Sequence, residues 1–310
     1  MKILVTGAAG YIGSVLVPGL LKSGHNVIAL DNFMYNQTSL LDCCKHKELT
    51  VIRGDARDKV LISTCLKKVD AIFPLACFTG APLCKKHPFE AKTIIVDAVK
   101  MILELRSKEQ MVIFPTTNSG YGIGQEGIFC TEETPLNPIS LYGKLKVEAE
   151  KALLDRGDSI TLRLATVFGV SPRMRLDLLV NDFTYRAVND RFIVLFEAHF
   201  RRNYIHICDV TKAFIYCLDN FERMKNEPYN VGLSDANLNK WELCEEIKKQ
   251  IPEFYFVKAE IGEDPDKRDY IVSNEKIEET GFKPDVSLKE GIAELIKGYQ
   301  IIKRNQYSNI

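Results

Sequence analysis

The first half of the chain alternates short runs of consecutive apolar residues with longer stretches in which apolar residues recur at helical spacing. The short runs predict strands at 2–6, 26–30, 50–53, 71–75, 111–116 and 159–165. The longer stretches predict helices at 11–23, 39–46, 58–67, 89–106 and 141–155. Because Ile, Val and Leu occupy consecutive strand positions, helices should cover both faces of the sheet, which predicts a doubly wound parallel α/β fold.

This rhythm ends after Gly169, where an expected loop at 171–175 precedes short strands and predicted helices at 176–188, 210–220, 240–250 and 288–303. We therefore expect two lobes, residues 1–169 and a smaller α/β lobe at 170–310, with some interleaving. Ligands of open α/β sheets bind beyond the carboxyl ends of the strands, so a cleft between the lobes is the expected ligand site.

The charge balance limits the partners that the chain can have. The 310 residues include 41 basic and 41 acidic side chains. A nucleic-acid partner is not expected, because it requires a clustered basic surface. A membrane partner is not expected either, because no uninterrupted apolar run approaches the roughly 20 residues of a spanning helix.

The start of the chain and its cysteines indicate the compartment. Met1 leads directly into a predicted strand and a glycine turn, without room for a secretory signal. Nine cysteines, none in a C-x-x-C pair, are typical of a reducing compartment, so we expect a cytoplasmic protein. Cys43, Cys44 and His46 lie together, but no second group of ligands accompanies them, and no metal site is predicted.

Three glycines, Gly7, Gly10 and Gly13, follow the first predicted strand and open the first predicted helix. This spacing is typical of the dinucleotide-binding turn of Rossmann folds, where glycines allow a tight turn, close approach to a pyrophosphate and close packing of helix on strand. Asp31 ends the second predicted strand about 20 residues later, where a carboxylate accepts hydrogen bonds from the adenosine ribose. Because its charge repels a 2′-phosphate, the pattern predicts NAD rather than NADP.

A tyrosine and a lysine form the candidate catalytic pair. Tyr142 and Lys146 are four residues apart at the start of a predicted helix and therefore share one face. An ammonium beside a phenol favours the phenolate, so the pair predicts a base that takes a proton from a hydroxyl while hydride leaves the same carbon. Lys144, two residues from Tyr142, should face away. Thr117, in the turn after the fifth predicted strand, can orient the substrate oxygen.

In combination these motifs resemble those of extended short-chain dehydrogenase/reductases that act on nucleotide sugars, over essentially the whole chain. The matching motifs are the glycine turn, Asp31, Gly54-Asp55, Leu75-Ala76, Thr117 with Tyr121-Gly122, Tyr142-x-x-x-Lys146, and Arg202 to Val210. Within that family, the segments at 173–183 and 262–270 are most similar to the GDP-heptose 4-dehydrogenases of bacterial capsule synthesis, notably from Campylobacter.

The resemblance implies roles for individual residues. It implies that NAD is bound by Gly7, Gly10, Tyr11, Ile12, Gly13, Asp31, Asn32, Asp55, Ala56, Leu75, Ala76, Tyr142 and Lys146. It implies that Thr117, Tyr142 and Lys146 are catalytic, and that Thr117, Asn181, Arg202 and Arg268 bind the nucleotide sugar. It also implies a homodimer formed through the predicted helices at 89–106 and 141–155.

The sequence leaves the choice among the arginines open. A diphosphate on a chain without net charge requires a few well-placed guanidinium groups. The eligible residues are Arg173, Arg175, Arg201, Arg202 and Arg268. Each of them could equally be a solvated surface charge.

Two reactions of the family lack their characteristic residues here. Dehydratases carry Asp-Glu after the catalytic threonine, whereas this chain has Asn118 and Ser119, and neither titrates usefully. Members that epimerise beside a ketone use a cysteine and a histidine, but position 119 is serine and no histidine lies between His87 and His199. Oxidation at C4 of the sugar remains.

The product of that oxidation is either released as a ketone by a 4-dehydrogenase or reduced again on the other face by a 4-epimerase. Thr166 and Ile95 stand where sugar epimerases often carry asparagine. We therefore favour a 4-dehydrogenase with a GDP-sugar substrate, with a 4-epimerase as the alternative. A non-catalytic NAD-binding regulator is a third possibility, although such proteins typically lose the tyrosine or the lysine.

Overall fold

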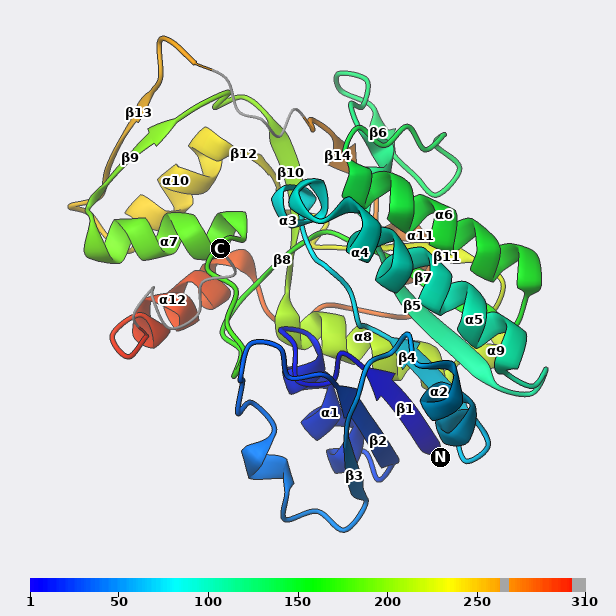
Figure 1. The fold of residues 1–310 in the computed structure, drawn as a ribbon. Coiled ribbons are helices and arrows are strands. Elements are labelled where there is room, and N and C mark those ends of the chain that lie inside the picture. The colour runs from blue at the N-terminus through cyan, green and yellow to red at the C-terminus, as the bar shows by residue number, and fades with distance from the viewer. Residues whose placement is uncertain (263–267, 303–310) are drawn as a thin grey trace.

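A seven-stranded parallel sheet forms the centre of the computed structural model, which describes residues 1–262 and 268–302 (Figure 1). Its strands, in spatial order, are β3 (Leu49–Arg53), β2 (Asn26–Asp31), β1 (Lys2–Thr6), β4 (Ala71–Pro74), β5 (Met111–Thr117), β7 (Ser159–Leu164) and β11 (Pro228–Val231). The strand order reverses between β1 and β4, which creates the crevice where such sheets bind ligands. The predicted doubly wound α/β fold is confirmed.

Helices cover both faces of this sheet (Figure 1). One face packs against α1 (Gly13–Lys22) and α8 (Ile207–Asp219), and the other against α2 (Lys59–Leu66), α5 (Ala98–Leu105) and α6 (Leu141–Arg156). Ile3 and Val5 belong to the first core, whereas Leu4 between them belongs to the second. Two buried faces explain why the strands are continuously apolar rather than alternating.

The second lobe is built from shorter elements. Its strands are β8 (Thr166–Phe168), β10 (Arg201–His206) and β12 (Asn237–Asn239) in one sheet, β9 (Phe192–Leu195) with β13 (Tyr255–Lys258), and β6 (Phe129–Cys130) with β14 (Ile271–Val272). Its longer helices are α7 (Leu179–Asn189), α10 (Lys240–Lys248) and α12 (Leu288–Gly298). Because α8 and β11 return to the large sheet, the chain passes between the lobes more than once, and the division after residue 169 remains a prediction.

The helices predicted at 39–46 and 89–106 differ in the structure. The first is a single 3₁₀ turn, Leu41–Cys43, because only Leu40 and Cys43 of that stretch are buried and a longer helix would have no apolar face. The second consists of α4 (Pro88–Lys92), a π-helical turn (Thr93–Asp97) and α5. The helix predicted to reach residue 303 ends at Gly298, and residue 303 itself lies outside the described residues.

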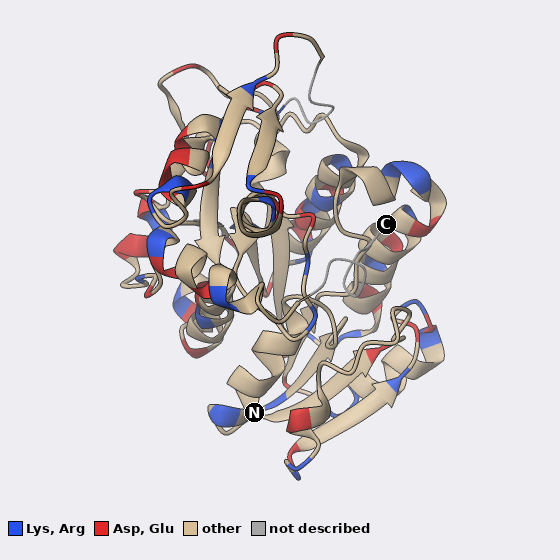
Figure 2. Cartoon of the chain, turned by 90° about the vertical axis from the view of Figure 1, so that its left-hand side faces the viewer, with Lys and Arg blue, Asp and Glu red and all other residues tan. Residues whose placement is uncertain are grey.

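The remaining elements are short: α3 (Ala81–Lys86), a 3₁₀ turn at Asn118–Tyr121, α9 (Phe221–Met224) and α11 (Glu275–Glu279). Within the described ranges, no helix combines the length and apolar character that crossing a bilayer requires. Nor does that part of the chain contain three His, Cys, Asp or Glu side chains grouped to hold a metal ion. Figure 2 shows acidic and basic residues mixed along the same helices and loops.

Candidate active site

One cleft, at the carboxyl ends of β1, β2, β4 and β5, contains most of the predicted site. The predicted residues that line it are Gly7, Gly10, Tyr11, Ile12, Gly13, Asp31, Asn32, Asp55, Ala56, Leu75, Ala76, Thr117, Tyr142, Lys146 and Arg268. Asn181 and Arg202 are not among the described residues that line it. The predicted dinucleotide and catalytic residues therefore share one continuous space.

The glycine turn has the shape that a bound pyrophosphate requires. Gly7 has a φ of +67°, and a Cβ there would lie 2.7 Å from the backbone nitrogen of Ala76. A Cβ at Gly13 would lie 2.5 Å from the carbonyl oxygens of Gly7 and Ala8. At the start of α1, the Gly13 N–H makes no backbone hydrogen bond within the described residues, whereas those of Ser14, Val15 and Leu16 donate to the carbonyls of Gly10 and Ile12. The amino terminus of the helix also carries a partial positive charge that favours an anion. These residues fit the pyrophosphate of NAD.

Asp31, at the end of β2, is held by the loops around it. The Ala9 N–H donates to Oδ2 at 2.9 Å, and the Phe33 N–H donates to Oδ1 at 2.8 Å. The Gln37 side chain adds a bond to Oδ1 at 3.2 Å. A carboxylate has about four acceptor positions, so Asp31 keeps the capacity to accept a hydrogen bond from a ribose hydroxyl. That ribose contact remains a prediction.

Further cleft residues on the dinucleotide side, among them Arg57 and Tyr35, were not predicted from the sequence, whereas Arg173 was one of the arginines eligible to bind the substrate diphosphate. Arg57 lines the cleft and pairs with Asp55 at 2.6 Å, and its hydrogen bond lowers the pKa of the Asp55 carboxyl. The Arg173 guanidinium lies 4.6 Å from the centre of the Tyr35 ring, and both residues line the cleft. Arg173 follows β8 and Tyr35 follows β2, so this contact joins the two lobes. An Asp-x-Arg spacing marks the first contact in the sequence, whereas no local pattern marks the second.

Helix α6 carries the candidate catalytic pair. Ser140 caps its first turn, and Tyr142 and Lys146 line the cleft, whereas Lys144 is exposed. The Lys146 ammonium is buried, and its Nζ donates to the Pro115 carbonyl at 2.8 Å. The predicted arrangement of the three side chains on the helix is therefore confirmed.

The charges around Tyr142 differ from the expectation. Burial raises the pKa of the Tyr142 phenol, and the nearby Cys77 thiol raises it further. The largest opposing charges, which favour the phenolate, are those of Arg175 and Arg268. Burial also lowers the pKa of Lys146. From the sequence, Lys146 was expected to lower the pKa of Tyr142. In the folded chain, Arg175 and Arg268 from the second lobe are the main charges that lower it.

Thr117 ends β5 and begins the following 3₁₀ turn. Its Oγ1 accepts a hydrogen bond from the Ser119 N–H at 3.1 Å and donates one to the Ser119 Oγ at 2.9 Å. Arg268 Nη1 also donates to the Ser119 Oγ. Ser119 therefore connects the predicted catalytic threonine with a predicted substrate-binding arginine.

Arg175 lines the substrate side of the cleft. Its Nε donates to Asp177 Oδ1 at 2.9 Å, and its side chain is 12% exposed. Burial is the largest single influence and opposes its charge, but the hydrogen bond and the negative charge of Asp177 together outweigh burial and raise the pKa of Arg175, so the guanidinium stays charged. Arg201, by contrast, pairs with Glu242 at 3.4 Å and is not among the described residues that line the cleft.

Asn181 is fully buried behind the cleft wall. Its Nδ2 donates to the Arg175 carbonyl at 2.8 Å and to the Tyr11 hydroxyl at 3.2 Å, and its Oδ1 accepts from the Gly169 N–H at 3.0 Å. The amide is thus occupied within the fold. The structure does not bring Asn181 to the position of a diphosphate ligand, and the residue instead holds the backbone of Arg175.

Arg202 occupies a similar position behind Arg268. It is 3% exposed, and its Nη1 donates to the carbonyl oxygens of Arg201 and Arg268. Its guanidinium also lies 5.5 Å from the centre of the Tyr270 ring. Of the two predicted substrate arginines, the structure places Arg268 in the cleft and Arg202 as its support.

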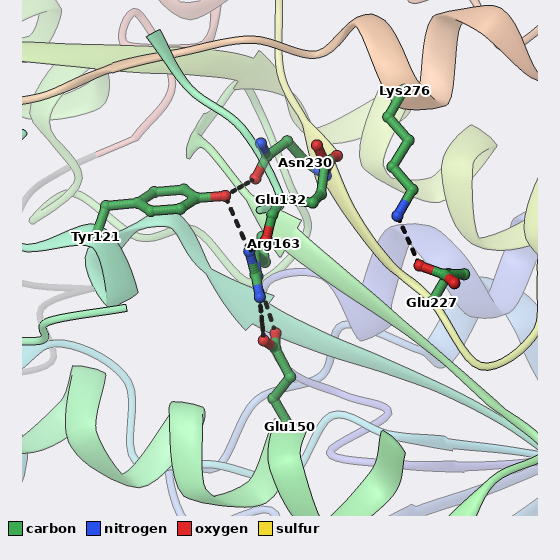
Figure 3. A network of polar contacts seen from close by, with 7 residues as sticks. All are labelled: Tyr121, Glu132, Glu150, Arg163, Glu227, Asn230 and Lys276. Atoms are coloured by element: carbon green, nitrogen blue, oxygen red, sulfur yellow. Dashed lines mark hydrogen bonds and ion pairs between the residues drawn. The ribbon is translucent and has the colours of Figure 1, made fainter. Parts of the chain in front are cut away.

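Figure 3 shows a buried network behind the catalytic turn. Arg163 on β7 pairs with Glu150 on α6 at 2.7 Å and donates to the Tyr121 hydroxyl at 3.1 Å. That hydroxyl donates to Asn230 Oδ1 on β11 at 2.7 Å. Because Tyr121 ends the turn that begins after Thr117, the network fixes the turn against two strands and a helix.

Comparisons with known proteins agree with this geometry. Residues 3–232 match the model of the NAD dependent epimerase/dehydratase family. An uncharacterized UDP-glucose epimerase of Bacillus subtilis (strain 168) is 30% identical and covers 94% of this chain and 96% of its own length. UDP-glucuronic acid decarboxylase 1 of Arabidopsis thaliana is 26% identical and covers 97% of this chain and 70% of its own length.

Among solved structures, a similar one is UDP-glucuronic acid 4-epimerase from Bacillus cereus in complex with UDP-glucuronic acid and NAD. It has a TM-score of 0.84 at 24% identity and covers 97% of this chain and 99% of that one. This likeness shows a common fold over nearly the whole chain.

Proposed function

The chain belongs to the NAD dependent epimerase/dehydratase family, and on that premise we propose that it is an NAD-dependent enzyme that oxidises a nucleotide-linked sugar at C4. One observation carries the proposal: Thr117, Tyr142 and Lys146 line the same cleft as the glycine turn. The relatives named above act on, or are crystallised with, UDP-sugars, which supports a nucleotide-sugar substrate.

Each of these residues has a separate chemical role at the reacting carbon. NAD, when bound, accepts the hydride that leaves C4. Tyr142 takes the proton of the 4-hydroxyl. The Thr117 hydroxyl turns from Ser119 Oγ to donate to the same substrate oxygen and orients it. Lys146, fixed to the Pro115 carbonyl, keeps a positive charge near the phenol. The sugar therefore loses a hydride and a proton and becomes a 4-ketone.

We propose GDP-D-glycero-α-D-manno-heptose as the substrate and the supply of a 4-keto sugar for capsular polysaccharide as the role. The support is the resemblance of residues 173–183 and 262–270 to GDP-heptose 4-dehydrogenases, of which residues 263–267 lie outside the described part. A 4-epimerase that retains its NAD is the second candidate, favoured by the epimerase among the relatives. Ile95, which packs in the apolar cluster that Tyr142 contacts, lacks the amide often present in epimerases.

A panel of GDP-, UDP- and dTDP-sugars tests the proposal. We expect NADH absorbance to appear with a GDP-heptose, and NMR and mass spectrometry to show a stoichiometric 4-keto sugar. An epimer without net NADH would establish the second candidate. If no sugar of the panel yields either product, the enzymatic proposal is wrong and a non-catalytic NAD-binding regulator is favoured.

The reaction should depend on pH through Tyr142. Because burial raises the pKa of Tyr142, the phenolate is the minor form at neutral pH. The single-turnover rate of NADH formation should therefore rise as the pH increases from neutral to alkaline. A rate that is flat or falls over that range, in an enzyme that stays folded, would argue against Tyr142 as the base.

We also propose a cytoplasmic homodimer that associates through α4, α5 and α6. Phe89 on α4 is 74% exposed and gives this surface apolar character. All nine cysteines are free, which suits a reducing compartment. Sedimentation at micromolar concentration should show a dimer, and a monomer would contradict the proposal.

A further inference from the structure

We propose that Arg175, whose positive charge is balanced by the carboxylate of Asp177, selects a neutral, hydroxyl-bearing sugar and rejects a sugar that carries a carboxylate. This inference deepens the proposed function and rests on it. It concerns a residue that the motifs left undecided among five arginines, and it assigns the property of the substrate that this residue recognises.

Arg175 lines the same cleft as Tyr142. Among the charged groups around Tyr142, Arg175 has the largest effect in favour of the phenolate. A Cβ on Gly80 would lie 3.7 Å from its Nη2, so the guanidinium reaches the loop that follows β4. A sugar whose C4 contacts Tyr142 therefore presents the substituents of neighbouring carbons to Arg175.

The bonding of Arg175 determines what it can recognise. Nε and Nη2 donate to the Asp177 carboxylate, whereas Nη1 makes no hydrogen bond to any residue that the structure describes. Asp177 itself is not among the described residues that line the cleft, so it holds the guanidinium from behind. The free donors of Nη1 suit hydroxyl oxygens. A carboxylate ligand would bring a second negative charge close to Asp177, which disfavours it.

The Arg175 side chain is also held in advance. Asn181 donates to the Arg175 carbonyl at 2.8 Å and is itself fixed by Gly169. Two neighbouring anchors, one on the backbone and one on the guanidinium, reduce the entropy that substrate binding would otherwise cost. This arrangement gives the buried Asn181 a positioning role.

The experiment measures binding by calorimetry, without turnover, to the NAD-loaded enzyme. The ligands are UDP-glucose, UDP-glucuronic acid and UDP, and in a second series GDP-mannose, GDP-mannuronic acid and GDP. The proteins are the wild type, R175M, D177N and the control D182N, which alters the Asp182–Arg186 pair of α7, neither member of which is among the described residues that line the cleft.

We expect the wild type to bind the neutral sugar nucleotide more tightly than the acidic one. R175M should lower the affinity for the neutral sugar nucleotide by about 10- to 100-fold, as expected for the loss of hydrogen bonds from a charged donor. The affinity for the free nucleoside diphosphate should stay nearly unchanged. D177N should unmask the positive charge and shift the preference toward the acidic sugar by about tenfold, whereas D182N should not shift it.

Two results would overturn the inference. One is a wild-type preference for the acidic sugar. The other is an R175M variant that loses the free diphosphate as much as the sugar nucleotide, which would make Arg175 a phosphate ligand. If R175M does not fold, the D177N variant tests the inference, through the ratio of its dissociation constants for the neutral and the acidic sugar nucleotide. Because only binding is measured, an enzyme that reduces no NAD would refute the proposed function and still leave the preference of Arg175 measurable.

Discussion

The two halves of the cleft are built in different ways. The dinucleotide half consists mainly of backbone: Gly7 and Gly13 shape the turn, and Asp31 is held by the N–H groups of Ala9 and Phe33. The half that we propose to bind the sugar, called the sugar half below, consists of side chains from four distant segments, represented by Thr117, Tyr142, Arg175 and Arg268. The first half depends on space and conformation, whereas the second depends on charges placed by long-range contacts.

This difference explains how a chain without net charge can bind two diphosphates. The glycine turn and the amino terminus of α1 offer space and a partial positive charge for one of them without any charged residue. The other requires a guanidinium group that is held in place, and in this structure Arg202 supports the backbone of Arg268. Substitutions that fill the space around the glycine turn should therefore weaken NAD binding, and substitutions that remove charged side chains should weaken nucleotide-sugar binding.

The largest effect is expected in the sugar half. Y142F should lower the rate of hydride transfer by roughly 10²- to 10⁴-fold, because the phenol can no longer accept the proton. Affinity for NAD should change little. Rapid-mixing measurement of NADH absorbance tests this, with K144Q as the control because Lys144 is exposed on the same helix. Wild-type turnover in Y142F would exclude the assigned base.

In the dinucleotide half, G7A should abolish measurable NAD affinity. Its Cβ would lie 2.7 Å from the Ala76 nitrogen, and Gly7 has a φ of +67°. G127A is the matched control, because Gly127 has a φ of +74° but no atom within 4 Å of the added Cβ. We expect it to cost only the backbone strain of about 1–2 kcal/mol in unfolding free energy. Equal loss of NAD binding in both variants would show that conformation alone, not space, matters.

The network in Figure 3 links the sugar half to the core. E150Q should lower the free energy of unfolding by about 3 kcal/mol, because it leaves the buried Arg163 without a charged partner. E227Q is the control, since the Glu227–Lys276 pair is partly exposed and should contribute less than about 1 kcal/mol. Urea denaturation measures both. Similar losses in the two variants would contradict the role given to burial.

Arg268 and the Arg202 that supports its backbone should separate ligand binding from structural support. R268M should weaken nucleotide-sugar binding by about tenfold and leave NAD binding unchanged. R202M should weaken nucleotide-sugar binding as well and should also lower the thermal midpoint, because Arg202 is 3% exposed and holds the Arg268 backbone. Calorimetry and thermal unfolding test the pair. A parallel loss of NAD affinity in R268M would mean that the two halves are not independent.

The smallest effect is expected where the halves meet. Y35A removes the aromatic partner of Arg173 and should raise the dissociation constant of NAD by about two- to fivefold, as for a cation–π contact whose aromatic ring is exposed. Y255A is the control, because it alters an exposed tyrosine of β13 that stacks on Phe192 of β9. An unchanged NAD affinity in Y35A would show that the contact between Tyr35 and Arg173, which joins the two lobes, does not contribute to NAD binding.

The sequence by itself determined the features whose partners lie close along the chain. The glycine turn and Asp31 fall within the first elements, and Tyr142 and Lys146 share a helix face through their spacing alone. Continuous apolar strands also predicted the parallel sheet, because burial of both faces leaves that signature. The helix expected at 39–46 failed because its two buried residues could not support it.

Only the tertiary structure decided which polar residues reach the cleft. Asn181 and Arg202 have suitable side chains, yet the fold turns them toward Arg175, Tyr11 and Arg268, where they hold the cleft wall. Arginine side chains are long and flexible, so their position in the sequence does not determine where the guanidinium lies. The contacts that position them join segments far apart in the chain, and local patterning carries no record of such contacts.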